Sequence, residues 1–301
     1  MNGAPLVDPP LLAGRDRYER LMEGWIDATG EDALTHTVEL GDTDRRVEVV
    51  VVAAPSPTYE VRAASCRALT GNLDPAVARG FPRLAGTALV AGLTRRVAEA
   101  TGPGAGAALV LEATIEAARL ARQVARLPRE RAERALLGPR ACWDLDTTGW
   151  VDLPDSCFTY SPAGRALLDT RTVATSMRPD LYSPRPGQRR VFVRRKVARL
   201  EREPGLLRLF HSMYDDAHGF EITYEIDRQS GRIVRAASMT PRLPYVGICS
   251  EAQRRIDALA GETLDEGLRK RIQTHLGGTS GCAQLYDLTA DLLKLLRADP
   301  A

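Results

Sequence analysis

Long apolar runs, a signal-type N-terminus and a strong charge bias are all missing from this sequence. No apolar stretch approaches the roughly 18 residues that a membrane-spanning helix needs. Lys and Arg total 41 and Asp and Glu total 39, so a net charge of +2 argues against electrostatic binding to nucleic acid or a membrane surface. The first residues contain prolines and no basic cluster, which is typical of a flexible tail. We therefore expect a cytoplasmic protein whose partner is a small-molecule ligand or another protein.

The familiar catalytic and metal-binding motifs are missing too. The five cysteines contain no CxxC pair, the four histidines contain no HxxxH pair, and neither GxSxG nor HExxH occurs. Widely spaced cysteines in odd number favour a reducing compartment, where thiols are free, buried or metal-bound. We interpret Cys66, Cys142 and Cys157 as packing residues and His36 as a surface or capping residue.

The sequence does contain one stretch twice. Residues 61–66 read VRAASC and residues 234–239 read VRAASM, and each is followed by Leu-Ala-Gly, Leu and Gly-Leu in the same order. Such self-similarity predicts two related domains. The copies differ in reactive side chains, because Cys282 is matched by Ala107 and His218 by Arg45. The second copy is therefore the expected place of a functional site.

Each copy is expected to place strands before helices, the α+β pattern. Residues 220–226 alternate polar and apolar side chains, which predicts a half-buried strand, and the basic run 189–196 predicts a strand with one solvated face. Further strands are expected over residues 46–52, 59–63, 190–200, 206–214 and from 232. Capping boxes at Ser250 and Thr263 predict helices over 251–259 and up to Gly277, and leucine spacing predicts a third helix toward Arg297.

The repeat and the composition suggest domain boundaries. We expect a flexible tail over residues 1–16, a degenerate repeat over 17–137, an insert over 138–187 and a second repeat over 188–301. The insert is rich in Pro, Gly, Asp and Ser, but it also contains aromatic side chains: Trp143, Trp150, Phe158, Tyr160 and Tyr182. Because a disordered linker rarely carries so many, we expect the insert to pack across the domains or to cover a cleft.

Two cysteines of the second copy occupy equivalent helix positions. Cys249 directly precedes Ser250, and Cys282 follows the glycine-rich residues 277–281. A helix N-terminus stabilises thiolate and lowers a cysteine pKa. With His218 in the same copy, a Cys/His site is chemically available, although free cysteines often only pack.

Three functions fit these residues. The first is an accessory protein that binds a small molecule or a metal in the second copy. The second is a cysteine- or metal-dependent enzyme of bacterial secondary or aromatic metabolism, with Cys249 or Cys282 as nucleophile and His218 as acid or base. The third is a scaffold or binding module without chemistry.

Several segments of the second copy resemble a known family. Residues 216–222 (DAHGFEI), Pro244-Tyr245, Cys249 and residues 276–285 (LGGTSGCAQL) resemble the DUF2889 family of uncharacterised bacterial proteins, over roughly residues 190–296. That family usually has His at the position of Gln284. The resemblance implies a zinc or iron site formed by His218, Cys249 and Cys282, with His275 or Asp287 as a substitute ligand.

The same layout is similar to the iron–sulfur scaffold fold of NifU and IscU proteins. There a small antiparallel sheet precedes the helices, one Cys follows the hairpin and another starts the final helix, as Cys249 and Cys282 would. The resemblance implies tandem duplicated IscU-like domains, each a small antiparallel sheet packed by about three helices. The cysteine that the scaffold has between these two is missing here.

Overall fold

The computed structural model describes residues 7–296 as a mixed α+β fold with antiparallel strand pairs. Its contacts divide the chain into two compact units. Of the described residues, the C-terminal unit comprises 7–19, 152–176 and 196–296, and the N-terminal unit comprises 20–151 and 177–195. No helix among residues 7–296 is both long and apolar enough to cross a bilayer.

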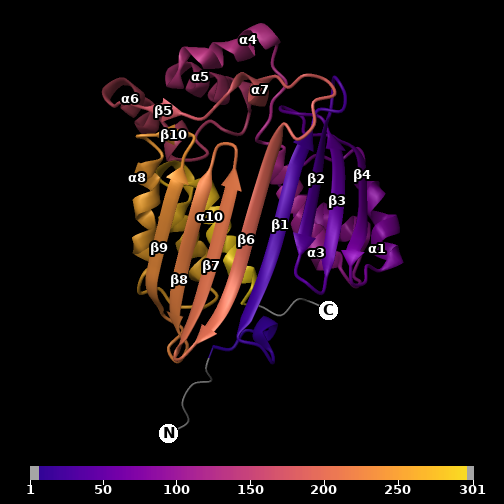
Figure 1. The fold of residues 1–301 in the computed structure, drawn as a ribbon, viewed down its shortest axis with the longest axis vertical. Helices are drawn as coiled ribbons and strands as arrows, with labels where there is room; N and C mark the ends of the chain where they lie inside the picture. Colours follow the sequence, from indigo (N-terminus) through magenta and orange to yellow (C-terminus); the bar gives the residue numbers. More distant parts are fainter. Residues whose placement is uncertain (1–6, 297–301) are drawn as a thin grey trace. The chain divides into compact units, whose positions relative to one another are not determined.

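The sheet of the C-terminal unit runs in the order β6-β7-β8-β9. Its strands are β6 (Phe192–Glu203), β7 (Leu206–Asp215), β8 (Gly219–Asp227) and β9 (Ile233–Arg242). Along β8, Phe220, Ile222, Tyr224 and Ile226 are buried and alternate with half-buried side chains, which confirms the predicted period-two strand. Helix α10 (Ala283–Lys294) packs on β7 and β8, as Figure 1 shows.

The basic part of β6 differs in part from the prediction. The strand has the predicted alternation and Arg195 is exposed, but Arg194 is fully buried and Lys196 is 5% exposed, so these two side chains do not lie on the solvated face. A buried ammonium group needs a partner of opposite charge. For Lys196, that partner is on α10, where Asp291 Oδ2 lies 3.6 Å from Lys196 Nζ.

Of the two capping boxes, the one at Ser250 predicted its helical segment correctly, whereas the helix expected from Thr263 begins at Leu268. The helical segments of the C-terminal unit are α8 (Ser250–Gln253) with η5 (Arg254–Leu259), α9 (Leu268–Leu276), η6 (Gly278–Ser280) and α10. The residue that caps α8 is Cys249, without a side-chain hydrogen bond. A helix cannot begin at Thr263, because residues 261–264 are hydrogen-bonded to the start of β9: Ile233 N–H donates to Glu262 O, and Leu264 N–H to Gly231 O.

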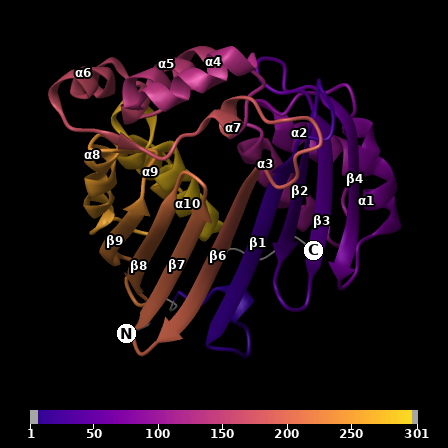
Figure 2. The same ribbon diagram turned by 45° about the horizontal axis from the view of Figure 1, so that its top comes forward.

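The N-terminal unit has strands in the order β4-β3-β2-β1. They are β1 (Arg17–Asp27), β2 (Leu34–Gly41), β3 (Arg46–Ala53) and β4 (Val61–Thr70), of which the sequence predicted only the last two. The helical segments that follow are α1 (Pro75–Gly80), η2 (Phe81–Leu84), α2 (Leu93–Thr101) and α3 (Ala107–Leu120). Helix α3 packs on β2 and β3 (Figure 2).

The two units repeat the same order of strands and helices and some of the same local contacts. Val61 N–H donates to Thr87 O and Ile233 N–H to Glu262 O, both at 2.8 Å. Thr114 Oγ1 donates to Val110 O in α3, and Thr289 Oγ1 donates to Leu285 O in α10. The two units therefore share local structure, but Val61 is equivalent to Ile233 and not to Val234, so the predicted match of the VRAAS stretches is wrong by one residue: Val61 is buried, whereas Val234 is 53% exposed.

The remaining segments lie at the start of the chain, between α3 and β6, and between β9 and α8. They are η1 (Pro10–Leu12), α4 (Arg129–Glu133), η3 (Arg134–Leu137), α5 (Pro139–Gly149), η4 (Phe158–Tyr160), α6 (Pro162–Thr170), β5 (Ala174–Thr175), α7 (Pro179–Tyr182) and β10 (Tyr245–Val246). The predicted insert is divided between the units, with residues 152–176 in the C-terminal one. Its aromatic side chains pack, since the rings of Trp150 and Tyr182 meet edge to face at 5.7 Å.

The prediction of a flexible tail is wrong for residues 7–16, while residues 1–6 lie outside the described part. Leu12 in η1 is fully buried, and Val7 N–H donates to Arg228 O at 2.8 Å. Asp8 and Asp16 pair with Arg202. This segment is therefore anchored on the C-terminal unit.

The buried Lys196–Asp291 pair offers a test of this packing. Asp291→Asn keeps the shape of the side chain but leaves the Lys196 charge buried without its counter-charge, so we expect a loss of about 3 kcal/mol in the free energy of unfolding, measured in urea. Lys294→Met is the control, because Lys294 pairs with the same carboxylate from a position that is 37% exposed. Equal destabilisation by the two variants would contradict a structural role for the buried pair.

Candidate functional site

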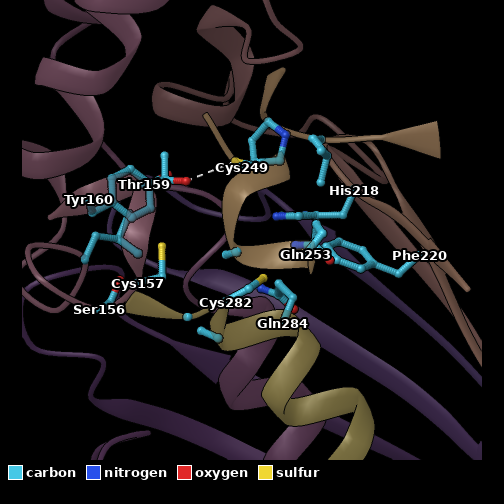
Figure 3. A pocket seen from close by; sticks show the side chains of 16 residues that line it. Ser156, Cys157, Thr159, Tyr160, His218, Phe220, Cys249, Gln253, Cys282 and Gln284 are labelled. Atoms are coloured by element: carbon cyan, nitrogen blue, oxygen red, sulfur yellow. Dashed lines mark hydrogen bonds between the residues drawn. The ribbon is translucent and has the colours of Figure 1, made fainter. Parts of the chain in front are cut away.

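A pocket with a volume of about 90 Å³ lies within the C-terminal unit. Its lining contains three cysteines and a histidine, Cys157, Cys249, Cys282 and His218 (Figure 3). The other lining residues are Leu153, Ser156, Thr159, Tyr160, Phe220, Leu243, Pro244, Ala252, Gln253, Gly281, Ala283 and Gln284. No Asp, Glu, Lys or Arg is among these described lining residues, so the pocket wall is uncharged apart from any proton on His218.

Four separate chain segments carry these reactive groups. His218 precedes β8, Cys249 precedes α8, Cys282 precedes α10 and Cys157 precedes η4. The η4 segment is attached by a backbone hydrogen bond from Phe158 N–H to Gly281 O at 2.8 Å. The structure thus brings together the three predicted residues and adds Cys157, which the sequence had assigned to packing.

Burial keeps the three thiols protonated. Cys249 is 8% exposed, its sulfur lies 3.1 Å from Thr159 Oγ1, and burial raises the pKa of its thiol to about 12. Burial also raises the pKa of Cys157 to about 11. The pKa of Cys282 is raised by burial as well, although the backbone N–H groups of Leu285 and Gln284 oppose this.

The expectation that helix N-termini lower these pKa values is therefore wrong. The helix after Cys249 has only four residues, so few aligned peptide dipoles act on its sulfur. Helix α10 is longer, with 12 residues, but the loss of water around Cys282 outweighs the donors at its start. At neutral pH the pocket presents thiols and not thiolates.

His218 is held by a neighbouring carboxylate. Asp215 Oδ1 accepts hydrogen bonds from the backbone N–H groups of Ala217 and His218, and it lies 3.1 Å from His218 Nδ1. An ionised carboxylate only accepts, so this contact assigns the proton of the neutral ring to Nδ1 and leaves Nε2 as an acceptor. Figure 3 shows the imidazole directed toward the pocket. Asp215 therefore orients the ring of His218.

Gln253 contributes a buried amide to the pocket. The residue is 6% exposed, and neither Nε2 nor Oε1 has a hydrogen-bond partner among residues 7–296. A polar contact with Cys282 opposes the rise of that thiol's pKa but does not meet the geometry of a hydrogen bond. Gln284, half-buried at the start of α10, lines the same pocket.

Other predicted ligands lie elsewhere. Asp287 is not among the lining residues and acts on Cys282 only through its charge, which raises the thiol pKa. His275 Nε2 lies 3.3 Å from Glu262 Oε1, and His211 Nδ1 lies 2.9 Å from Leu288 O. The interpretation of His36 as a surface or capping residue is wrong, because it is fully buried and burial lowers its pKa to about 4.

The cysteine and histidine side chains of the pocket do not fit the predicted zinc or iron site. Among residues 7–296, no group of three or more His, Cys, Asp or Glu side chains is placed so that it could hold a metal ion. Metal binding by cysteine requires thiolate, and burial disfavours that form at all three sulfurs. The described arrangement does not fit a metal centre, and metal binding through His218, Cys249, Cys282 and Asp287 stays a prediction from the sequence.

Comparison with known proteins supports part of the resemblance. Residues 207–296 match the family described as Protein of unknown function (DUF2889). This match contains His218, Cys249, Gln253 and Cys282, whereas Cys157 lies outside it. No curated protein and no solved structure matches the chain.

The raised thiol pKa values predict slow alkylation. At pH 8 we expect Cys157 and Cys249 to react with iodoacetamide about 100-fold or more slowly than in the urea-unfolded chain, and Cys282 also to react more slowly, because only thiolate reacts. Mass spectrometry of the labelled peptides measures each rate. Rapid labelling of any one of these cysteines in the folded protein would contradict the raised thiol pKa values.

The same shifts predict a loss of stability in alkali. The folded state holds these protons more tightly than the unfolded chain, whose thiols titrate near pH 8.5. The stabilisation is thus complete below that pH and decreases as pH rises toward the folded pKa values of about 11 and about 12 for Cys157 and Cys249. Replacing both residues by Ala should flatten the fall of unfolding free energy between pH 8.5 and 10.5.

Proposed function

We propose that the pocket of the C-terminal unit binds a small, largely apolar molecule, and that the protein acts as a small-molecule-binding accessory protein. The observation that carries this proposal is the convergence of three neutral thiols and one oriented imidazole on a cavity without charged lining residues. Apolar cavities with a few placed polar groups are the usual form of small-molecule sites.

The properties of the pocket limit the ligand. A volume of about 90 Å³ suits a compact molecule or one ring of a larger one. Neutral sulfur is polarisable and packs well against apolar and aromatic groups, so Cys157, Cys249 and Cys282 act as part of the apolar wall beside Phe220 and Leu243.

We also infer that the two units derive from one duplicated domain, with the IscU-like order of sheet and helices. The repeated hydrogen bonds at Val61 and Ile233, together with the same order of elements, support this inference. Because Ala107 and Arg45 replace Cys282 and His218, the N-terminal copy would be a structural partner.

A second candidate is a thiol-dependent enzyme, which the pairing of Asp215 with His218 favours. In this case Nε2 of His218 would take the proton of a pocket thiol as that sulfur attacks an electrophilic ligand. The alkylation measurement tests it: a thiol that labels rapidly in the wild type and slowly in His218→Gln would support the enzyme, and equally slow labelling in both would exclude it.

Cyclopentanone is a suitable probe for the binding proposal, because it is small, uncharged and largely apolar. We expect it to shift NMR signals of pocket residues with a dissociation constant on the order of 1 mM. Ala283→Phe should abolish these shifts, since Ala283 is exposed and lines the pocket. Ala163→Phe, at an exposed position in the first turn of α6 outside the pocket, is the control. Shifts that persist in Ala283→Phe would place binding elsewhere.

Elemental analysis separates this proposal from the metal-binding alternative. Protein purified without a His tag should contain less than about a tenth of an equivalent of zinc or iron, because the thiols are held protonated. Metal near one equivalent, lost in Cys249→Ser, would support a metal centre instead.

A further inference from the structure

The amide of Gln253 is the feature of the pocket that protein contacts leave unexplained. Its residue is 94% buried, it lines the pocket, and neither of its polar atoms has a hydrogen-bond partner among residues 7–296. Figure 3 places its side chain among those of Cys282, His218 and Phe220. Both polar atoms of a buried amide normally form hydrogen bonds, because an amide without partners loses its hydration without compensation.

A ligand that satisfies Gln253 must offer two groups side by side. Nε2 is a donor and needs an acceptor, whereas Oε1 is an acceptor and needs a donor. A carboxylate or a ketone offers acceptors alone, and an alkylammonium group offers donors alone. A primary carboxamide, a lactam or a heteroaromatic ring with N–H next to C=O offers both on one edge.

The uncharged wall of the pocket favours the same class of ligand, one without a net charge. No Lys or Arg is among the described lining residues, so an anionic ligand would depend on a protonated His218 for its counter-charge. No Asp or Glu is among them either, so a cation would have no counter-charge at the wall. An uncharged ligand loses the least hydration on entering such a site.

The geometry points to an uncharged ligand with an amide-type edge, which pairs with Gln253 by two hydrogen bonds while its apolar body lies against Phe220 and Leu243. This assignment rests on the proposed small-molecule pocket and names its ligand class. Gln253 is then the residue that determines specificity, and the thiols and apolar side chains supply the enclosing wall.

Two ring compounds of equal size test the assignment. 2-Pyrrolidinone presents N–H and C=O on one edge, whereas cyclopentanone replaces the N–H with a methylene group. Butyrate serves as an anionic probe. NMR titration of the full chain should give 2-pyrrolidinone at least fivefold tighter binding than cyclopentanone, because the ketone leaves Oε1 of Gln253 without a donor. Butyrate should bind more weakly than either.

Variants at the two pocket glutamines make the test specific. Gln253→Leu keeps the side-chain size and should remove the preference for 2-pyrrolidinone while cyclopentanone still binds. Gln284→Leu is the matched control and should keep the preference, since Gln284 is only half-buried and water can solvate its amide. The side-chain NH₂ signals of Gln253 in the wild type give a direct readout of its pairing with a bound carbonyl group, and 2-pyrrolidinone should shift them downfield.

The outcomes distinguish the two proposals. If none of the probes shifts pocket signals, the small-molecule pocket itself is wrong. If cyclopentanone and 2-pyrrolidinone bind equally, or if Gln284→Leu and not Gln253→Leu removes the preference, the pocket stands and the amide-edge assignment is overturned. Tighter binding of butyrate would also overturn it.

Discussion

A polar group that is buried in the C-terminal unit needs a hydrogen-bond or ion-pair partner, or it must be uncharged. This constraint applies both to the core of the unit and to the pocket. In the core, Lys196 is paired with Asp291, and Tyr224 Oη lies 2.7 Å from Thr289 Oγ1. At the site, Asp215 is satisfied by two backbone donors and His218. The cysteines meet the constraint by remaining protonated. Gln253 stands out because neither polar atom of its buried amide has a hydrogen-bond partner among residues 7–296.

The alternation of β8 was predictable, and β6 and β7 were predicted as strands, but the burial of charged or polar side chains on strand faces was not predictable. Strand β8 buries four apolar side chains in strict alternation. Strand β1 has the same burial period, but its buried face includes Arg20, paired with Glu112 at 2.7 Å. Strand β2 buries His36. A partner on another element decides whether such a residue is buried, and the local sequence does not contain that information.

The site was predictable in its residue types and not in its electrostatics. Helix starts identified Cys249 and Cys282, and the DUF2889-like string contained His218. A helix terminus is worth about 0.3–1 kcal/mol, however, and one pKa unit corresponds to about 1.4 kcal/mol. That contribution cannot offset a desolvation that raises the pKa of Cys249 to about 12. Desolvation depends on the segment with Cys157 and Thr159, which is distant in sequence.

The segment with Cys157 and Thr159 affects the explanation of why the two copies of the repeat differ in reactive side chains. Cys282 and His218 are matched by Ala107 and Arg45 in the proposed N-terminal copy, and this difference would explain the asymmetry only if the repeat alone formed the pocket. In the C-terminal unit it does not, because Cys157, Thr159 and Tyr160 come from residues between the repeats and complete the wall. The hydrogen bond from Phe158 to Gly281 fixes that wall beside Cys282. The site thus depends on the segment outside the repeat as much as on the residues in which the two copies differ.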